Sequence, residues 1–167
     1  MPTTDTIDVR DFAEEAFLAR DTPDRPHALI AVGSTRNAET ARIARTLAAH
    51  LEIVGFIVEI AEAVEHGMPG PPDYDLVIIG LSHHLHDHDL LRWIEGIGTT
   101  LCDVTSALFL LGRGHDRTHV MARLAEAGWR PHAVTTFPDS EDPGDIERSI
   151  AAFVENLATL VSARATS

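Results

Sequence analysis

At 167 residues and 44% apolar composition, the chain is long enough to bury the core of one domain. Its formal net charge of −13 argues against a nucleic-acid-binding protein, because such proteins need clustered cations. All 13 basic residues are arginines, which excludes phosphate motifs and Schiff-base chemistry that depend on lysine. The single cysteine, Cys102, excludes an internal disulfide, and its apolar neighbours predict a small buried side chain.

The chain shows no sign of a membrane span or of a secretion signal. No apolar stretch reaches the roughly 18 to 20 residues that a spanning helix needs. The first residues are acidic and polar, without the basic and then apolar order of a signal peptide. We therefore expect a cytoplasmic protein that does not span a membrane.

The amino-terminal part of the chain differs in character from the rest. Residues 8–20 predict a short amphipathic helix. The residues on its apolar face are Phe12, Ala16 and Ala19. Two prolines then interrupt the chain before the first long apolar run. We expect residues 1–26 to form a helical extension, either packed on the core or used at a partner surface, and residues 27–167 to form the main domain.

Within that domain, short apolar runs alternate with segments of helical periodicity. The runs predict strands at 27–33, 53–60, 75–80, 106–112 and 132–136. Helices are predicted at 38–50, from about 90, at 118–127 and at 141–163. Continuous apolar strands between helices indicate an α/β fold with a parallel sheet covered on both faces. Five such strands suit a flavodoxin-like three-layer sandwich of order 2-1-3-4-5, whose ligand crevice lies where the connections of strands one and three diverge.

The loop after the first predicted strand carries the clearest binding pattern. Its hydroxyl groups, together with the free N–H groups and dipole of the next helix, are suited to hold a phosphate. The residues expected to contribute are Ser34, Thr35, Arg36, Asn37, Ala38 and Thr40. An ordinary Ser/Thr-rich turn between strand and helix is the alternative.

This loop resembles the FMN phosphate loop of flavodoxins, and more closely the Ser-Thr-x-x-Gly-x-Thr version of the menaquinone-dependent protoporphyrinogen oxidases. Ser34, Thr35 and Thr40 match the hydroxyl positions, whereas Ala38 replaces the glycine. Similarity to that family extends from about Ala28 to Phe137, but the long insertion that those oxidases carry after strand four is missing. The resemblance implies a flavodoxin-like fold, FMN as cofactor, and a redox protein or a quinone as partner.

The loop after the third predicted strand is rich in histidine. In flavodoxins this loop packs against the flavin ring, so the resemblance implies ring contacts by residues here. The residues concerned are Ser82, His83, His84, Leu85 and His86. A metal site is the competing interpretation, since imidazoles bind zinc, nickel and copper. Its ligands would be His84, His86 and His88. A solvated loop is the third possibility.

A glycine-rich turn follows the fourth predicted strand, and a bound flavin would have this turn on its other side. Its glycines allow close approach of the backbone to a ring, and its basic side chains could meet anionic groups. The residues are Gly112, Arg113, Gly114 and His115. A plain turn fits the same residues.

The sequence thus favours an FMN-binding flavodoxin-like protein in electron transfer or flavin-dependent oxidation. No residue is identified as an acid–base catalyst. The alternatives are a flavin-free domain that serves binding or assembly, and a metal-binding protein that uses the histidine-rich loop. Each of these functions is compatible with a homodimer.

Overall fold

The computed structural model describes residues 25–34, 38–63, 70–82, 88–112, 117–137 and 142–165. The predicted extension, residues 1–26, lies outside this set apart from its last two residues. The division of the chain into an extension and a main domain therefore stays a prediction. Among the helices of the described residues, none has the length and hydropathy needed to cross a bilayer.

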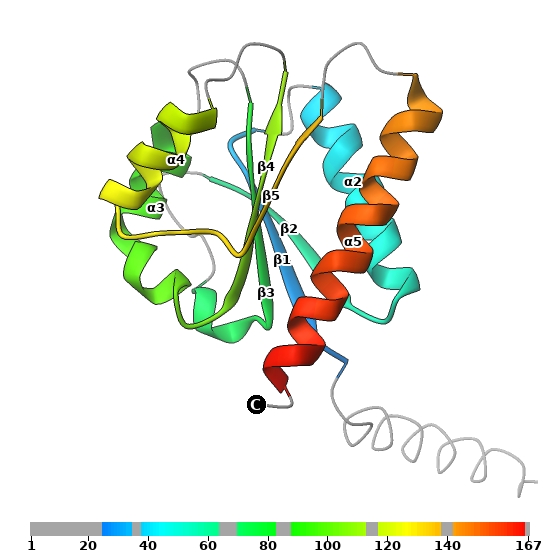
Figure 1. Cartoon of the computed structure of the whole chain (residues 1–167), viewed down its shortest axis with the longest axis horizontal. Helices are drawn as coiled ribbons and strands as arrows, with labels where there is room; N and C mark the ends of the chain where they lie inside the picture. The colour runs from blue at the N-terminus through cyan, green and yellow to red at the C-terminus, as the bar shows by residue number, and fades with distance from the viewer. Residues whose placement is uncertain are drawn as a thin grey trace, which may run out of the picture.

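The core of the fold is one five-stranded sheet in which every neighbouring pair of strands is parallel. Its order is β2-β1-β3-β4-β5, which confirms the expected topology (Figure 1). The strands are β1 (His27–Val32), β2 (Ile57–Glu62), β3 (Leu76–Leu81), β4 (Thr105–Leu111) and β5 (Ala133–Phe137). Consecutive parallel strands need crossover connections, each of which returns the chain over one face of the sheet to the start of the next strand.

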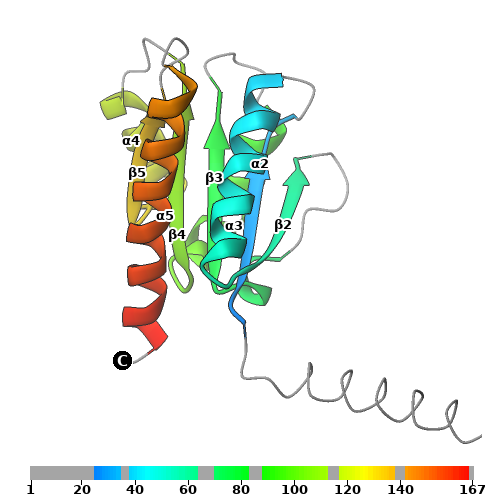
Figure 2. The same ribbon diagram turned by 90° about the vertical axis from the view of Figure 1, so that its right-hand side faces the viewer.

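Helices cover both faces and complete a three-layer sandwich (Figures 1 and 2). One face carries α2 (Ala38–Ile53) and α5 (Pro143–Ala165), and the other carries α3 (His88–Leu101) and α4 (Arg117–Glu126). The crossover from β2 to β3 contains the short 3₁₀ turn η1 (Pro71–Asp73). All five strands point their carboxyl ends toward the same edge, where the crossover loops to the helices begin (Figure 1).

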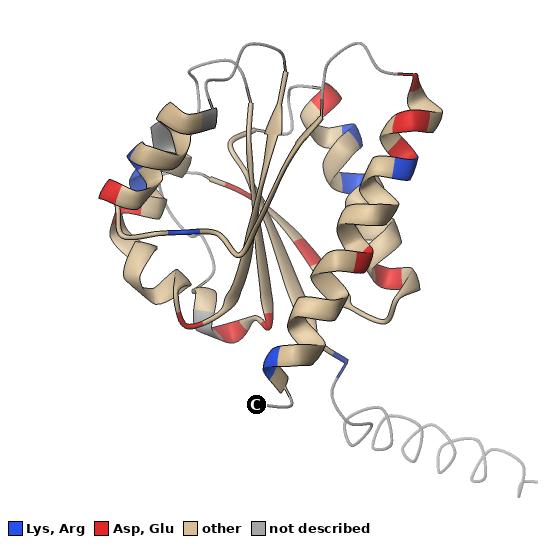
Figure 3. Ribbon diagram, viewed as in Figure 1, with Lys and Arg blue, Asp and Glu red and all other residues tan. Residues whose placement is uncertain are grey.

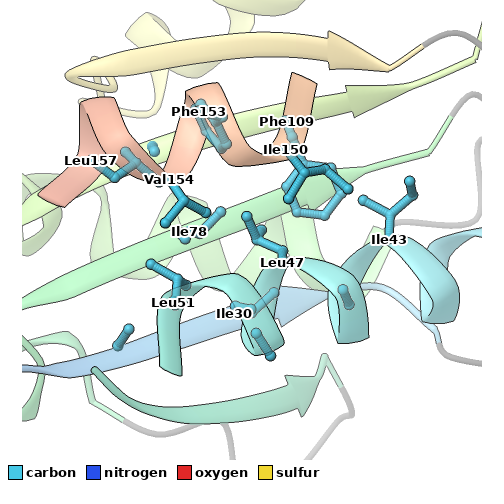
Figure 4. Close-up of a cluster of buried hydrophobic side chains, with 14 of the residues drawn as sticks. Ile30, Ile43, Leu47, Leu51, Ile78, Phe109, Ile150, Phe153, Val154 and Leu157 are labelled. Atoms are coloured by element: carbon cyan, nitrogen blue, oxygen red, sulfur yellow. The ribbon is translucent and has the colours of Figure 1, made fainter. Parts of the chain in front are cut away.

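The buried side chains form one cluster on each face of the sheet. Under α2 and α5, Ile30, Ile78 and Phe109 of the sheet pack against Leu47 and Ile150 of the helices (Figure 4). The intervening strand residues belong to the cluster under α3 and α4. Because both faces are buried, β3 and β4 are apolar or small almost throughout, which explains why their sequences lack polar alternation.

The end of α2 differs from the sequence prediction, which began the second strand at residue 53. Ile53 is instead the last residue of α2, and β2 begins at Ile57. Gly55 has φ +107°, and the N–H groups of Gly55 and Phe56 donate to the carbonyls of Glu52 (3.1 Å) and Leu51 (3.0 Å). This pair of bonds is the Schellman motif, which ends a helix at a left-handed residue. The β-branched run was therefore assigned four residues too early.

Two further side chains test the predicted core. Trp129 is fully buried on the α3 and α4 face, and its Nε1 donates to the Ser106 hydroxyl at 2.8 Å. Ser106 also donates its N–H to Nδ1 of His132 (3.1 Å). The prediction that Cys102 is buried was wrong: the thiol is exposed, because Cys102 falls in the turn that follows α3.

Tyr74, the sole tyrosine, joins the segment before β3 to the outer strand β2. Its hydroxyl donates to Oε2 of Glu59 at 2.5 Å. Burial, and then the hydrogen bond and charge of Glu59, raise the pKa of Tyr74 from 10.0 to about 12. The folded state thus favours the neutral phenol, and this stabilisation is complete below pH 10 and lost as the pH rises to about 12. We expect the phenolate absorbance, which reports Tyr74 alone, to titrate with a midpoint near pH 12.

Two variants separate the causes of that shift. Glu59→Gln keeps an acceptor but removes the charge, so the midpoint should fall toward 10.0 without reaching it. In the unmodified protein the unfolding free energy should fall between pH 10 and 12, and in Tyr74→Phe this fall should be absent. A midpoint at 10.0 in the unmodified protein would show that neither the burial of the Tyr74 hydroxyl nor its hydrogen bond to Glu59 is present in solution.

Candidate flavin site at the carboxyl edge

The three loops expected to form the site begin side by side. Val32 of β1 is in register with Gly80 of β3, and Leu81 of β3 with Leu110 of β4. The residues that follow these strands, Ser34, Ser82 and Gly112, therefore emerge at one edge of the sheet (Figure 1). This is the edge at which ligands bind in open α/β sheets of this order, close to the point where the connections from β1 and β3 diverge to opposite faces.

The first loop is described at both ends. Gly33 is half-buried and Ser34 exposed, and α2 begins at Ala38. Thr35, Arg36 and Asn37 lie outside the described residues. Thr40 lies in the first turn of α2 and is only 3% exposed, and its Oγ1 is buried. The first N–H groups of a helix lack partners within it and carry a positive potential. The start of α2 thus suits an anion.

Ala38 stands where the resembling loops have a glycine, and the backbone conformation at this position decides whether an alanine is tolerated there. It is helical, exposed, and the first residue of α2. An alanine is costly where the backbone needs a positive φ, but it is the most favourable residue within a helix. The backbone at Ala38 is right-handed, so the methyl group causes no strain there. The replacement of glycine by Ala38 is therefore compatible with a phosphate group at this end of α2.

Glu39 is a residue that sequence reasoning passed over. It is half-buried in the first turn of α2, between Ala38 and Thr40. When no anion is bound, a carboxylate in this position stabilises the helix through its interaction with the helix dipole. It repels an anion that binds to the same N–H groups. Its place within the Ser-Thr-x-x-x-x-Thr pattern was the available signal.

The third-strand loop is described only at its borders. Ser82 follows β3 directly and is half-buried, and His88 is the first residue of α3. The residues between them, His83, His84, Leu85 and His86 included, lie outside the described residues. The ring contacts and the alternative metal ligands His84, His86 and His88 therefore stay predictions. In the part of the chain that the structure describes, no three His, Cys, Asp or Glu side chains are placed to hold a metal.

The fourth-strand loop begins with a backbone constraint. Gly112 is buried, has φ +102°, and donates its N–H to the carbonyl of Phe137 at 3.1 Å. The bond ties the end of β4 to the end of β5, and the left-handed conformation turns the chain away from the strand direction. A residue with a side chain would be strained in this conformation, so the backbone itself explains why a glycine occupies this position. Arg113, Gly114 and His115 lie outside the described residues.

No protein-family profile matches the chain, and no curated protein is significantly similar to it. Solved structures do match. The flavodoxin of Streptococcus pneumoniae TIGR4 has a TM-score of 0.61 at 19% identity, over 80% of this chain and 98% of that protein. Rubredoxin oxygen:oxidoreductase from Desulfovibrio gigas has a TM-score of 0.65 at 19% identity, over 89% of this chain and 39% of the oxidoreductase.

A third match is a protein from Klebsiella pneumoniae assigned as a quinone reductase. Its TM-score is 0.56 at 12% identity, over 81% of this chain and 85% of that protein. The closer resemblance to the menaquinone-dependent protoporphyrinogen oxidases is not supported by any of these comparisons. At such identities the likeness concerns the backbone, and what it establishes is that the chain has the flavodoxin fold.

Proposed function

We propose that this chain binds FMN at the carboxyl edge of its sheet and acts in electron transfer or flavin-dependent oxidation. The supporting observation is that the start of α2, Ser82 and Gly112 meet at that edge of a sheet with flavodoxin order. The structures it resembles, two redox proteins among them, add weight to a redox role. Bound FMN would supply the electron-carrying chemistry. A redox protein or a quinone is the proposed partner.

The protein's own residues would bind and orient the cofactor. Ser34, Thr35 and Thr40 hydroxyls and the first N–H groups of α2 would donate to the phosphate. The loops after Ser82 and Gly112 would flank the ring and limit its contact with water. No side chain of the described residues is assigned a proton-transfer step.

Equilibrium titration with FMN and with riboflavin tests the proposal, with flavin fluorescence and visible absorbance as readouts. Riboflavin lacks the phosphate, so we expect FMN to bind at least about tenfold more tightly, the equivalent of about 1.4 kcal/mol. Equal affinity would overturn the phosphate assignment, and failure to bind either ligand would favour the flavin-free alternative.

Thr40→Val should weaken FMN binding by about tenfold to a hundredfold and leave riboflavin binding unchanged, since a hydrogen bond to a charged group contributes about 1.5 to 3 kcal/mol. Thr46→Val is the matched control. Thr46 lies in the same helix, and its hydroxyl donates to the Arg42 carbonyl (2.8 Å) at a distance from the helix start. Equal effects of the two substitutions on FMN binding would mean that Thr40 acts only through the helix.

Glu39→Gln should strengthen FMN binding by about twofold to fivefold, since charges near a helix start contribute about 0.3 to 1 kcal/mol. The gain should shrink at high salt, because the interaction is screened. Riboflavin affinity, measured in parallel, should not change. A variant that binds FMN more weakly would show that the Glu39 carboxylate supports the loop instead of opposing the phosphate.

A further inference from the structure

The outer margin of β2 is the least protected apolar part of the described surface. β2 lies at one end of the strand order and pairs only with β1 (Figure 2). The large apolar side chains that are exposed among the described residues all fall between residues 53 and 60. They are Ile53 (79% exposed), Val54 (50%), Ile57 (43%) and Ile60 (36%).

Ile60 pairs with Ile30 on the α2 face, whereas Ile57 lies on the α3 face. The exposure of Ile57 follows from the connection from β2 to β3. Each of the other crossovers contains an α-helix, whereas the described part of this one contains only η1. By register, Ile57 and Ala61 share the α3 face of the sheet with Leu29 and Ala31. Leu29 and Ala31 are fully buried, but Ile57 and Ala61 are not. A helix laid along β2 on this face would bury them.

We propose that the amino-terminal segment 8–20 of the same chain packs as a helix along β2 on the α3 face. The chain enters the described structure beside this surface. The N–H of Ile57 donates to the carbonyl of Pro26 at 2.9 Å, so residue 26 adjoins the first residue of β2. Residues 21–25 then join this point to the segment, a short tether whose far end stays near Ile57.

The dimensions of the segment match those of the strand. Residues 8–20 as a helix measure about 20 Å, and the six residues of β2 also span about 20 Å. Running back from Pro26, the helix would place Ala19 near Ile57 and Phe12 near Ala61. Its apolar face then meets Ile57 and Ala61, and Glu59, which accepts the hydrogen bond from Tyr74, lies between them on the same face.

Charge does not draw the segment to this surface. Asp8 and Asp11 of the segment would lie on the same face of the sheet as Glu59, so the contact would be held by apolar burial. Added salt should therefore not release the segment, because screening weakens the repulsion between these carboxylates.

Disulfide trapping in the full chain tests the proposal. In a Cys102→Ser background, Ala19→Cys is combined with Ile57→Cys, and Leu18→Cys with Ile57→Cys serves as the matched control. Residues 18 and 19 have nearly the same tether length, but they lie about 100° apart on a helix. We expect an intramolecular disulfide to form at least about tenfold faster with residue 19, through its higher effective concentration. Equal rates would overturn the proposal, as would disulfides formed mainly between two molecules, which would make a second copy the occupant.

Amide hydrogen exchange of the full chain gives an independent measurement. Residues 8–20 should be protected in the unmodified protein and lose that protection in Ile57→Asp, while β3 and β4 stay protected in both. Ile57 is 43% exposed, so this substitution should not unfold the domain. Absence of protection at 8–20 in the unmodified protein would overturn the proposal. Neither measurement depends on whether the chain binds a flavin.

Discussion

Replacing Gly98 with alanine is expected to lower the unfolding free energy by about 3 kcal/mol. Gly98 lies in the last half of α3, and a Cβ there would come within 2.1 Å of the carbonyl oxygen of Ala127. That oxygen belongs to the turn after α4, whose backbone is fixed by Gly128 at φ +87° and by the bond from Trp129 N–H to the Leu124 carbonyl. The methyl group therefore forces the two helices apart.

The matched control lies two residues away in the same helix. Gly96 is exposed, and a Cβ added there meets nothing within 4 Å. Gly96→Ala should raise the unfolding free energy by about 0.5 to 1 kcal/mol, because alanine is the better helix former. Chemical denaturation of the three proteins measures both effects. Stabilisation by both substitutions would mean that α3 and α4 are farther apart in solution.

Gly80→Ala is expected to cost about 3 kcal/mol for a different reason. Gly80 of β3 pairs directly with Phe109 of β4, and an added Cβ would lie 2.1 Å from the end of the Phe109 ring. That ring is fully buried, and it packs against Phe137 with a centroid distance of 6.0 Å. It cannot swing aside without disturbing the cluster under α2 and α5 (Figure 4).

Because the obstacle at Gly80 is a side chain, a second substitution should relieve it. Phe109→Leu alone should cost about 1 kcal/mol or more. The double variant should lose at least about 1 kcal/mol less than the sum of the single losses. Additive losses would show that the ring is not what the new methyl group meets. At Gly98 no side-chain substitution can give this relief, since the obstacle is a backbone carbonyl.

Much of the fold could be predicted from the sequence because it follows from local patterns. Strands buried on both faces have to be apolar along their whole length, and this pattern distinguishes β3 and β4 at once. The boundary between α2 and β2 was predicted less well. Ile53 and Val54 are β-branched and were taken for strand, whereas the helix end is set by Gly55 and its two hydrogen bonds.

The candidate site was predictable in its position and less so in its details. The order of strands places the loops after β1, β3 and β4 at one edge, and their residue types indicate the ligand class. The consequence of Ala38 depended on whether it begins the helix, which the sequence left open. The bond from Tyr74 to Glu59 and the clash at Gly80 arise between segments that meet only through the register of the sheet. Local periodicity carries no information about such contacts.

The five strands differ in whether they carry charged residues, and this difference affects the aggregation of the protein at high concentration. Asp, Glu, Lys and Arg are absent from β1, β3, β4 and β5, whereas β2 carries Glu59 and Glu62 (Figure 3). An outer strand presents backbone groups that can template pairing with the strand of another molecule, and charged side chains oppose this. Glu59 and Glu62 therefore act as gatekeepers at the margin that also exposes Ile57 and Ile60. They disfavour pairing of β2 with β2 of another molecule, because such a pair would set carboxylate against carboxylate.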